Sequence, residues 1–111
     1  MSAITTHVLD TARGRPAAGV AIVLERLADG ATLGRGETDA DGRLRDLLPA
    51  GAPVEPGIYR LVFDTGGWFA AQERTTFYPE VVVTSTVGAG QDHLHVPLLL
   101  SPFAYSTYRG S

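Results

Sequence analysis

The sequence contains no cysteine, lysine or asparagine. Without cysteine the chain has neither a disulfide framework nor a thiolate metal site. Its 9 basic residues face 12 acidic ones, and the net charge of −3 differs from the basic balance typical of nucleic-acid-binding domains. No hydrophobic run is long enough for a membrane-spanning helix, and the first residues lack the basic and apolar regions of a secretory signal. We therefore expect a cytoplasmic protein with neither nucleic acid nor membrane as a partner.

The chain has 111 residues, of which 44% are hydrophobic, and this fits a single domain over residues 1–111. Short β-type runs alternate with turns rich in glycine, proline and aspartate. We expect strands at 5–9, 20–26, 31–38, 58–64, 80–87, 93–100 and 105–108, and one short helix at 68–73. Seven to eight short strands at this spacing predict an all-β fold, a two-sheet β-sandwich with one short helix.

The strand 93–100 carries two of the three histidines. Side chains alternate across a strand, so one face, the core face, carries Leu94, Val96, Leu98 and Leu100. His93 and His95 then point away from the core, toward a pocket, an interface or simply solvent. Pro97 lacks an amide proton, which predicts that this strand lies at a sheet edge or carries a bulge.

Two further residues are candidates for chemistry. His7 lies in the first strand, on the face opposite Thr6 and Val8. Arg43 follows the turn at 39–42, which lacks the downstream glutamate of a calcium loop and is better explained as a tight turn. His-x-His with one distant histidine and no nearby carboxylate motif is a weak zinc signature, so we expect no metal. Each residue alone is compatible with an ordinary solvated side chain.

Together these residues resemble the family of transthyretin-related 5-hydroxyisourate hydrolases. The resemblance covers nearly the whole chain and is strongest at 95–102 and in the tail 105–111, which closes with the specific sequence Tyr-Arg-Gly-Ser. The matching segments are 6–11, Gly14, 16–17, 38–43, 95–102 and 105–111.

The resemblance implies a transthyretin-like sandwich that forms a homotetramer, a dimer of dimers with its active sites at the dimer–dimer interface. It implies ring opening of 5-hydroxyisourate to 2-oxo-4-hydroxy-4-carboxy-5-ureidoimidazoline in urate breakdown, without a cofactor. The implied catalytic residues are His7, Arg43 and His95, and substrate binding adds Tyr108, Arg109 and Ser111.

Two alternatives stay open. The chain could be a transthyretin-like carrier of small aromatic ligands, although transthyretin lacks the three catalytic residue types and the Tyr-Arg-Gly-Ser ending. It could also be a sandwich module for adhesion or assembly, which would give the histidines no role.

Overall fold

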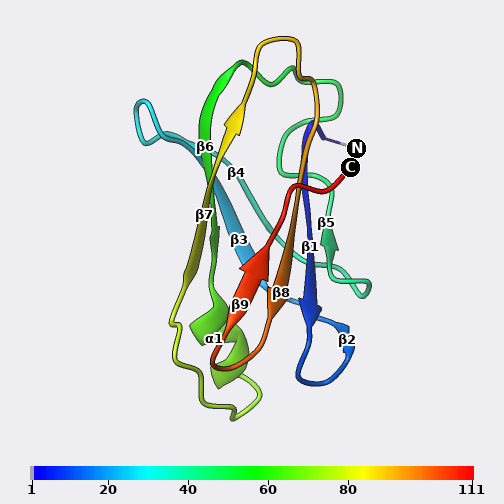
Figure 1. Ribbon diagram of the computed structural model, residues 1–111, viewed down its shortest axis with the longest axis vertical. Coiled ribbons are helices and arrows are strands. Elements are labelled where there is room, and N and C mark those ends of the chain that lie inside the picture. The colour runs from blue at the N-terminus through cyan, green and yellow to red at the C-terminus, as the bar shows by residue number, and fades with distance from the viewer. Residues whose placement is uncertain (1) are drawn as a thin grey trace.

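The computed structural model describes residues 2–111 and arranges them in two sheets that face each other (Figure 1). The five-stranded sheet has the order β2-β1-β8-β9, with β5 also paired to β1. Its strands are β1 (Ile4–Asp10), β2 (Arg15–Pro16), β5 (Arg43–Leu44), β8 (Leu94–Leu100) and β9 (Tyr105–Thr107). The four-stranded sheet has the order β4-β3-β6-β7. Its strands are β3 (Ala21–Arg26), β4 (Thr32–Glu37), β6 (Gly57–Phe63) and β7 (Val81–Val87). The predicted all-β sandwich with one short helix is confirmed.

The core lies between the sheets and follows the predicted alternation. Leu98 and Leu100 of β8 are fully buried, and Leu61 and Phe63 of β6 contribute from the opposite sheet. His95, on the other face of β8, is only partly buried. Burying one face of each sheet removes apolar surface from water and leaves the outer faces free for polar side chains.

The expectation that Pro97 marks a sheet edge or a bulge is wrong. β8 lies between β1 and β9, so both of its edges are used. Leu98 pairs with Thr107 and His95 pairs with Gly110, which is one unbroken register. Because Pro97 has no N–H to donate, the pairing lapses beside it and resumes at Gly110 without a bulge.

The helix α1 (Thr65–Ala70) begins three residues before the predicted position. Asp64 accepts a hydrogen bond from the Gly67 N–H at 3.0 Å and so caps the first turn. Gly66 lies against the backbone of Pro79, so close that a methyl group there would meet the Pro79 carbonyl oxygen at 2.6 Å. The glycine pair therefore lies in the first turn of the helix, ahead of the range 68–73 in which we expected it. No helix within residues 2–111 is long and apolar enough to cross a membrane.

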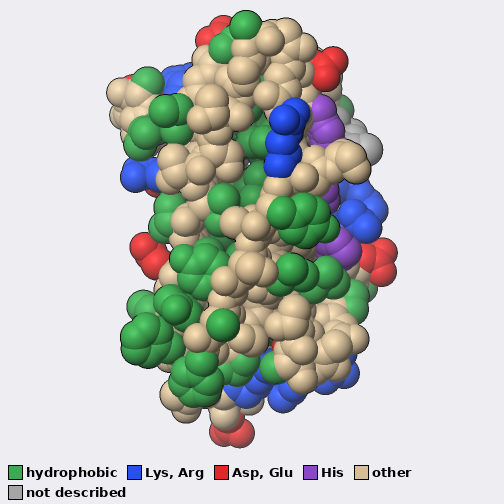
Figure 2. All heavy atoms as spheres, viewed as in Figure 1, with side chains coloured by type: hydrophobic (Ala, Val, Ile, Leu, Met, Phe, Trp, Pro, Cys, Tyr) green, Lys and Arg blue, Asp and Glu red, His purple; other side chains and the backbone are tan. Residues whose placement is uncertain are grey.

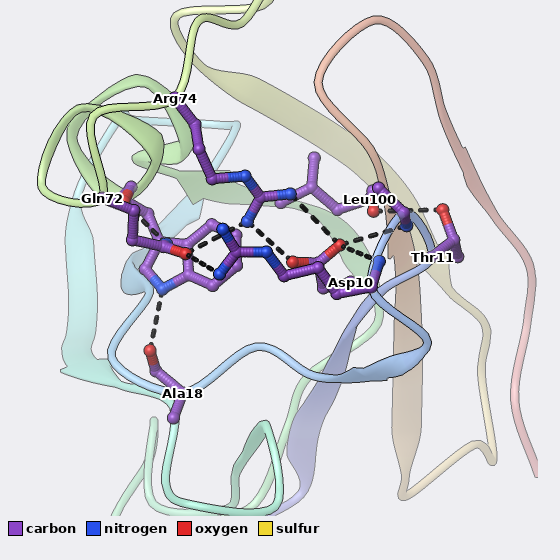
Figure 3. A network of polar contacts seen from close by, with 9 residues as sticks. Asp10, Thr11, Ala18, Gln72, Arg74 and Leu100 are labelled. Atoms are coloured by element: carbon purple, nitrogen blue, oxygen red, sulfur yellow. Dashed lines mark hydrogen bonds and ion pairs between the residues drawn. The ribbon is translucent and has the colours of Figure 1, made fainter.

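A polar network joins the segment after α1 to the end of β1 (Figure 3). Asp10 is 2% exposed and accepts a hydrogen bond of 2.8 Å from Arg74. The Arg74 guanidinium also lies 4.8 Å from the centre of the Phe69 ring. Burial opposes ionisation of Asp10, but the hydrogen bonds from Arg74 and from backbone N–H groups outweigh it and lower its pKa. This network fixes the end of the strand that also carries His7.

Candidate active site

Three strands of the five-stranded sheet bring the predicted catalytic residues together on its outer face. In the register of this sheet, Thr5 lies opposite His95, and His7 lies opposite both Arg43 and Pro97. Segments some 40 and 90 residues apart in the chain thus become neighbours through strand pairing alone. Figure 2 shows the histidine side chains along one side of the molecule, over β1 and β8, with basic side chains next to them.

A pocket of about 200 Å³ opens on this face. It is lined by Thr5, Thr6, Arg43, Arg45, His93, His95 and Ser111. His7 lies beside Arg43 in the sheet but is not part of the lining. A larger hollow of about 490 Å³ lies against the four-stranded sheet and contains no histidine. The smaller pocket is the candidate site because the groups suited to acid–base chemistry gather there.

His95 is held from two sides. Its Nδ1 lies 2.8 Å from the Thr5 hydroxyl, and its ring stacks on His93 with centroids 6.5 Å apart. Burial lowers the pKa of His95, and electrostatic interactions with Arg43 and the neighbouring histidines lower it further. The imidazole of His95 is therefore predominantly neutral at neutral pH.

His7 meets the turn that precedes β5. Its Nε2 lies 2.9 Å from the carbonyl oxygen of Asp41. A carbonyl oxygen can only accept a hydrogen bond, so Nε2 of His7 carries a proton. In the neutral form of this ring, Nδ1 holds the free lone pair.

The turn itself presents Arg43. Asp39 accepts hydrogen bonds of 2.9 Å from the backbone N–H groups of Asp41 and Arg43. The hydrogen bond from Arg43 lowers the pKa of Asp39 and keeps it ionised. Gly42 has φ +77° and packs so close to the Val8 carbonyl that any side chain would collide with it. The guanidinium therefore leaves a tightly defined backbone, as we expected from the turn sequence.

The last residues of the chain line two different pockets. The Gly110 N–H donates to the carbonyl of His95 at 2.9 Å, which brings Ser111 to the candidate pocket. Tyr108 and Arg109 instead line a separate hollow of about 250 Å³, together with residues of β7. The structure thus places Ser111 with His95, but not Tyr108 or Arg109.

Residues 4–110 match the model of the HIUase/Transthyretin family. The chain belongs to this family. A 5-hydroxyisourate hydrolase of Salmonella typhimurium is 46% identical over 110 residues, which cover 97% of this chain and 80% of that protein. The structure of a Klebsiella pneumoniae 5-hydroxyisourate hydrolase is similar with a TM-score of 0.88 and 40% identity, over 100% of both chains. Transthyretin from Sparus aurata is similar with a TM-score of 0.86 and 32% identity, over 99% of this chain and 97% of that one.

The family therefore contains hydrolases and transthyretins on one fold, and the side chains in the pocket must discriminate between them. A neutral imidazole can accept or relay a proton, and a guanidinium can stabilise a developing oxyanion. Within residues 2–111, no group of three or more histidine or acidic side chains is placed to hold a metal ion.

Sequence reasoning missed three residues of the pocket lining, Thr5, Thr6 and Arg45. Thr5 shares the strand parity of His7, and Arg45 lies two residues beyond Arg43. Alternation along each strand would have placed both on the outer face. Nothing in the sequence, however, indicates that the Thr5 hydroxyl meets an imidazole 90 residues away.

Proposed function

We propose that this chain hydrolyses 5-hydroxyisourate and opens its ring to 2-oxo-4-hydroxy-4-carboxy-5-ureidoimidazoline in urate breakdown. The observation that carries the proposal is that one pocket holds both the imidazole of His95 and the guanidinium of Arg43. Burial and the charge of Arg43 lower the pKa of this histidine, which suits it to proton transfer. The relatives named as 5-hydroxyisourate hydrolases support this choice of substrate.

The reaction adds water to the carbonyl carbon of a cyclic amide. The hydroxide part of water joins the carbon, the carbon–nitrogen bond breaks, and one proton moves to the leaving nitrogen. His7 and His95 supply the base and the proton relay, a contribution of about 10²–10⁴-fold. Arg43 offers planar N–H donors to the oxygen on which negative charge develops. The proposed steps need no cofactor.

We assign the substrate-binding roles in the tail to three residues. Ser111 lines the pocket and would contact the substrate there. Tyr108 and Arg109 would act indirectly, by holding the tail beside β8. In that position Gly110 packs against His95.

The proposal includes a cytoplasmic homotetramer, a dimer of dimers. The pocket is open on the outer face of a sheet, and the same face of a second subunit would close it. Excluding bulk water in this way strengthens the electrostatic stabilisation of the transition state.

The similarity to the Sparus aurata transthyretin keeps a carrier as the second candidate. A carrier would bind small aromatic ligands without turning them over, and it would not need an imidazole kept neutral beside an arginine. Turnover therefore separates the two candidates.

The test is the spectrophotometric decay of freshly generated 5-hydroxyisourate in the presence of the purified chain. We expect the wild type to accelerate the decay of the substrate. His95→Ala and Arg43→Ala should retain only a small fraction of this activity. Arg35→Ala on the opposite sheet is the matched control and should keep full activity. Gel filtration shows whether the variants assemble like the wild type. A wild type that binds the substrate but leaves its decay rate unchanged would establish the carrier instead.

A further inference from the structure

We infer that Arg45 is a specificity-determining residue of the pocket, which binds the carboxylate that ring opening creates. The inference rests on the proposed function for the identity of this carboxylate, but the binding of a carboxylate can be measured without turnover. It gives the two arginines of the pocket different tasks. Arg43 would stabilise the oxyanion of the transition state, and Arg45 would hold the product.

The residues around Leu44 place two arginine side chains on one face of the sheet. Leu44 is 8% exposed and packs into the core, so Arg43 and Arg45 on either side of it extend toward the outer face. Both line the pocket of about 200 Å³, and none of its lining side chains within residues 2–111 is acidic. Even with an α-carboxylate on Ser111 counted, the lining has a net positive charge, in a chain whose net charge is −3. The pocket therefore favours an anion.

The guanidinium of Arg45 is available to a ligand. Its Nη1 lies 3.9 Å from the Asp39 carboxylate, which is longer than a hydrogen bond, and the two side chains are 49% and 47% exposed. Ion pairs this open to solvent are weak. Asp39 already accepts hydrogen bonds of 2.9 Å from the backbone N–H groups of Asp41 and Arg43. It would therefore remain partnered if the Arg45 side chain turned to a ligand.

The two arginines differ in how firmly their side chains are held. The backbone of Arg45 is anchored, because its carbonyl oxygen accepts a hydrogen bond of 2.7 Å from the Ser2 N–H, but its side chain is exposed. Arg43 is half-buried and lies in β5, where it pairs with His7. Fixed donors suit a transition state, since they need not reorganise during the reaction. The exposed Arg45 is better suited to a charge that forms late and leaves with the product.

The proposed reaction creates such a charge. Water adds to the carbonyl carbon of the cyclic amide, the carbon–nitrogen bond breaks, and the leaving nitrogen gains a proton. The new carboxyl group then releases its own proton to solvent, because carboxyl groups ionise at about pH 4. A guanidinium offers two parallel N–H donors to the two oxygens of a carboxylate, a match that the uncharged amide of the substrate lacks. Arg45 would thus bind the product better than the closed ring.

The test compares two probes, allantoate and allantoin. Both carry a ureido group, but allantoate is an open carboxylate and allantoin is an uncharged ring. In isothermal titration calorimetry with the full chain, we expect the wild type to bind allantoate about tenfold more tightly than allantoin. Arg45→Gln should lower the affinity for allantoate about tenfold, as expected for the loss of one charged hydrogen-bonded pair, with little effect on allantoin. Arg45→Lys keeps the charge without the planar donors and should recover only part of this loss.

Arg15→Gln is the matched control. Arg15 belongs to β2 of the same sheet and is exposed, but it lines a different hollow. Its variant therefore removes an equal charge away from the pocket and should bind both probes like the wild type. In the substrate-decay assay, allantoate should inhibit the wild type and Arg15→Gln alike, and Arg45→Gln about tenfold more weakly.

Three results would overturn the inference. They are a wild type without preference for allantoate, an Arg45→Gln variant with unchanged affinity for it, and an equal loss of affinity in Arg15→Gln, which would assign the effect to net charge. The proposed function fails separately. A wild type that prefers allantoate but leaves the decay rate of 5-hydroxyisourate unchanged would refute the hydrolase and leave a carboxylate-binding pocket.

Discussion

Gly110 lies against the imidazole of His95, so adding a single methyl group there should perturb the candidate site. A Cβ atom on Gly110 would be 2.5 Å from Cδ2 of His95 and 3.2 Å from Cγ of Pro97. Carbon atoms in ordinary contact are about 3.5–4.0 Å apart, so the ring must retreat by about 1 Å. The backbone cannot easily retreat instead, because the Gly110 N–H donates to the His95 carbonyl at 2.9 Å.

A misplacement of about 1 Å costs on the order of 100-fold in rate. We therefore expect Gly110→Ala to lower kcat/KM about 100-fold, with little change in the midpoint of thermal unfolding. The assay is the decay of freshly generated 5-hydroxyisourate, accompanied by a thermal melt. Gly88→Ala is the matched control, because a Cβ there meets nothing closer than 3.7 Å. A Gly110→Ala variant with wild-type kcat/KM would refute the argument that the position of His95 limits the reaction.

Other perturbations test other parts of the structure. Gly42→Ala forces φ +77° on alanine and a collision with a β1 carbonyl, so it should cost about 1–3 kcal/mol in urea unfolding and lower kcat/KM by displacing Arg43. Asp10→Asn leaves Arg74 poorly paired in a largely buried position and should lower the free energy of unfolding by about 3–5 kcal/mol. Because Asp10 has its pKa lowered by folding, the unfolded chain binds more protons, and this stabilisation should disappear as pH falls below about 3.8 in acid titrations of stability. The lowered pKa of His95 keeps the neutral form present in mild acid, so the part of the pH profile of kcat/KM that depends on this residue should fall only below about pH 6.5. Dialysis against EDTA should leave turnover unchanged, and restoration of a lost activity by zinc would contradict the proposed steps.

The parts of the fold that depend on local alternation could be predicted from the sequence. The period-two pattern of β8 places Leu98 and Leu100 inside and His95 outside, and the structure has them so. The tight turn before Arg43 could also be predicted, because the hydrogen bonds of Asp39 and the positive φ of Gly42 are local features within five residues of sequence.

The features that depend on distant partners could not be predicted in the same way. Pro97 suggested a sheet edge or a bulge because the sequence does not show that β9 and Gly110 would pair on either side of it. The start of α1 was missed because the Gly66 backbone packs against Pro79, a contact across the chain. The hydrogen bond between Thr5 and His95 could not be predicted either, because only the pairing of β1 with β8 brings these two residues together.

The parallel pairing of β1 with β8 has a consequence for biosynthesis. β1 leaves the ribosome early, yet its partner follows about 90 residues later, a delay on the order of 5–20 s at usual translation rates. During that interval the strand that carries His7 has one edge without its final neighbour, and contacts so far apart in the chain also form slowly. A nascent chain that lacks β8 therefore cannot assemble the pocket, and activity should appear only after β8 has been synthesised.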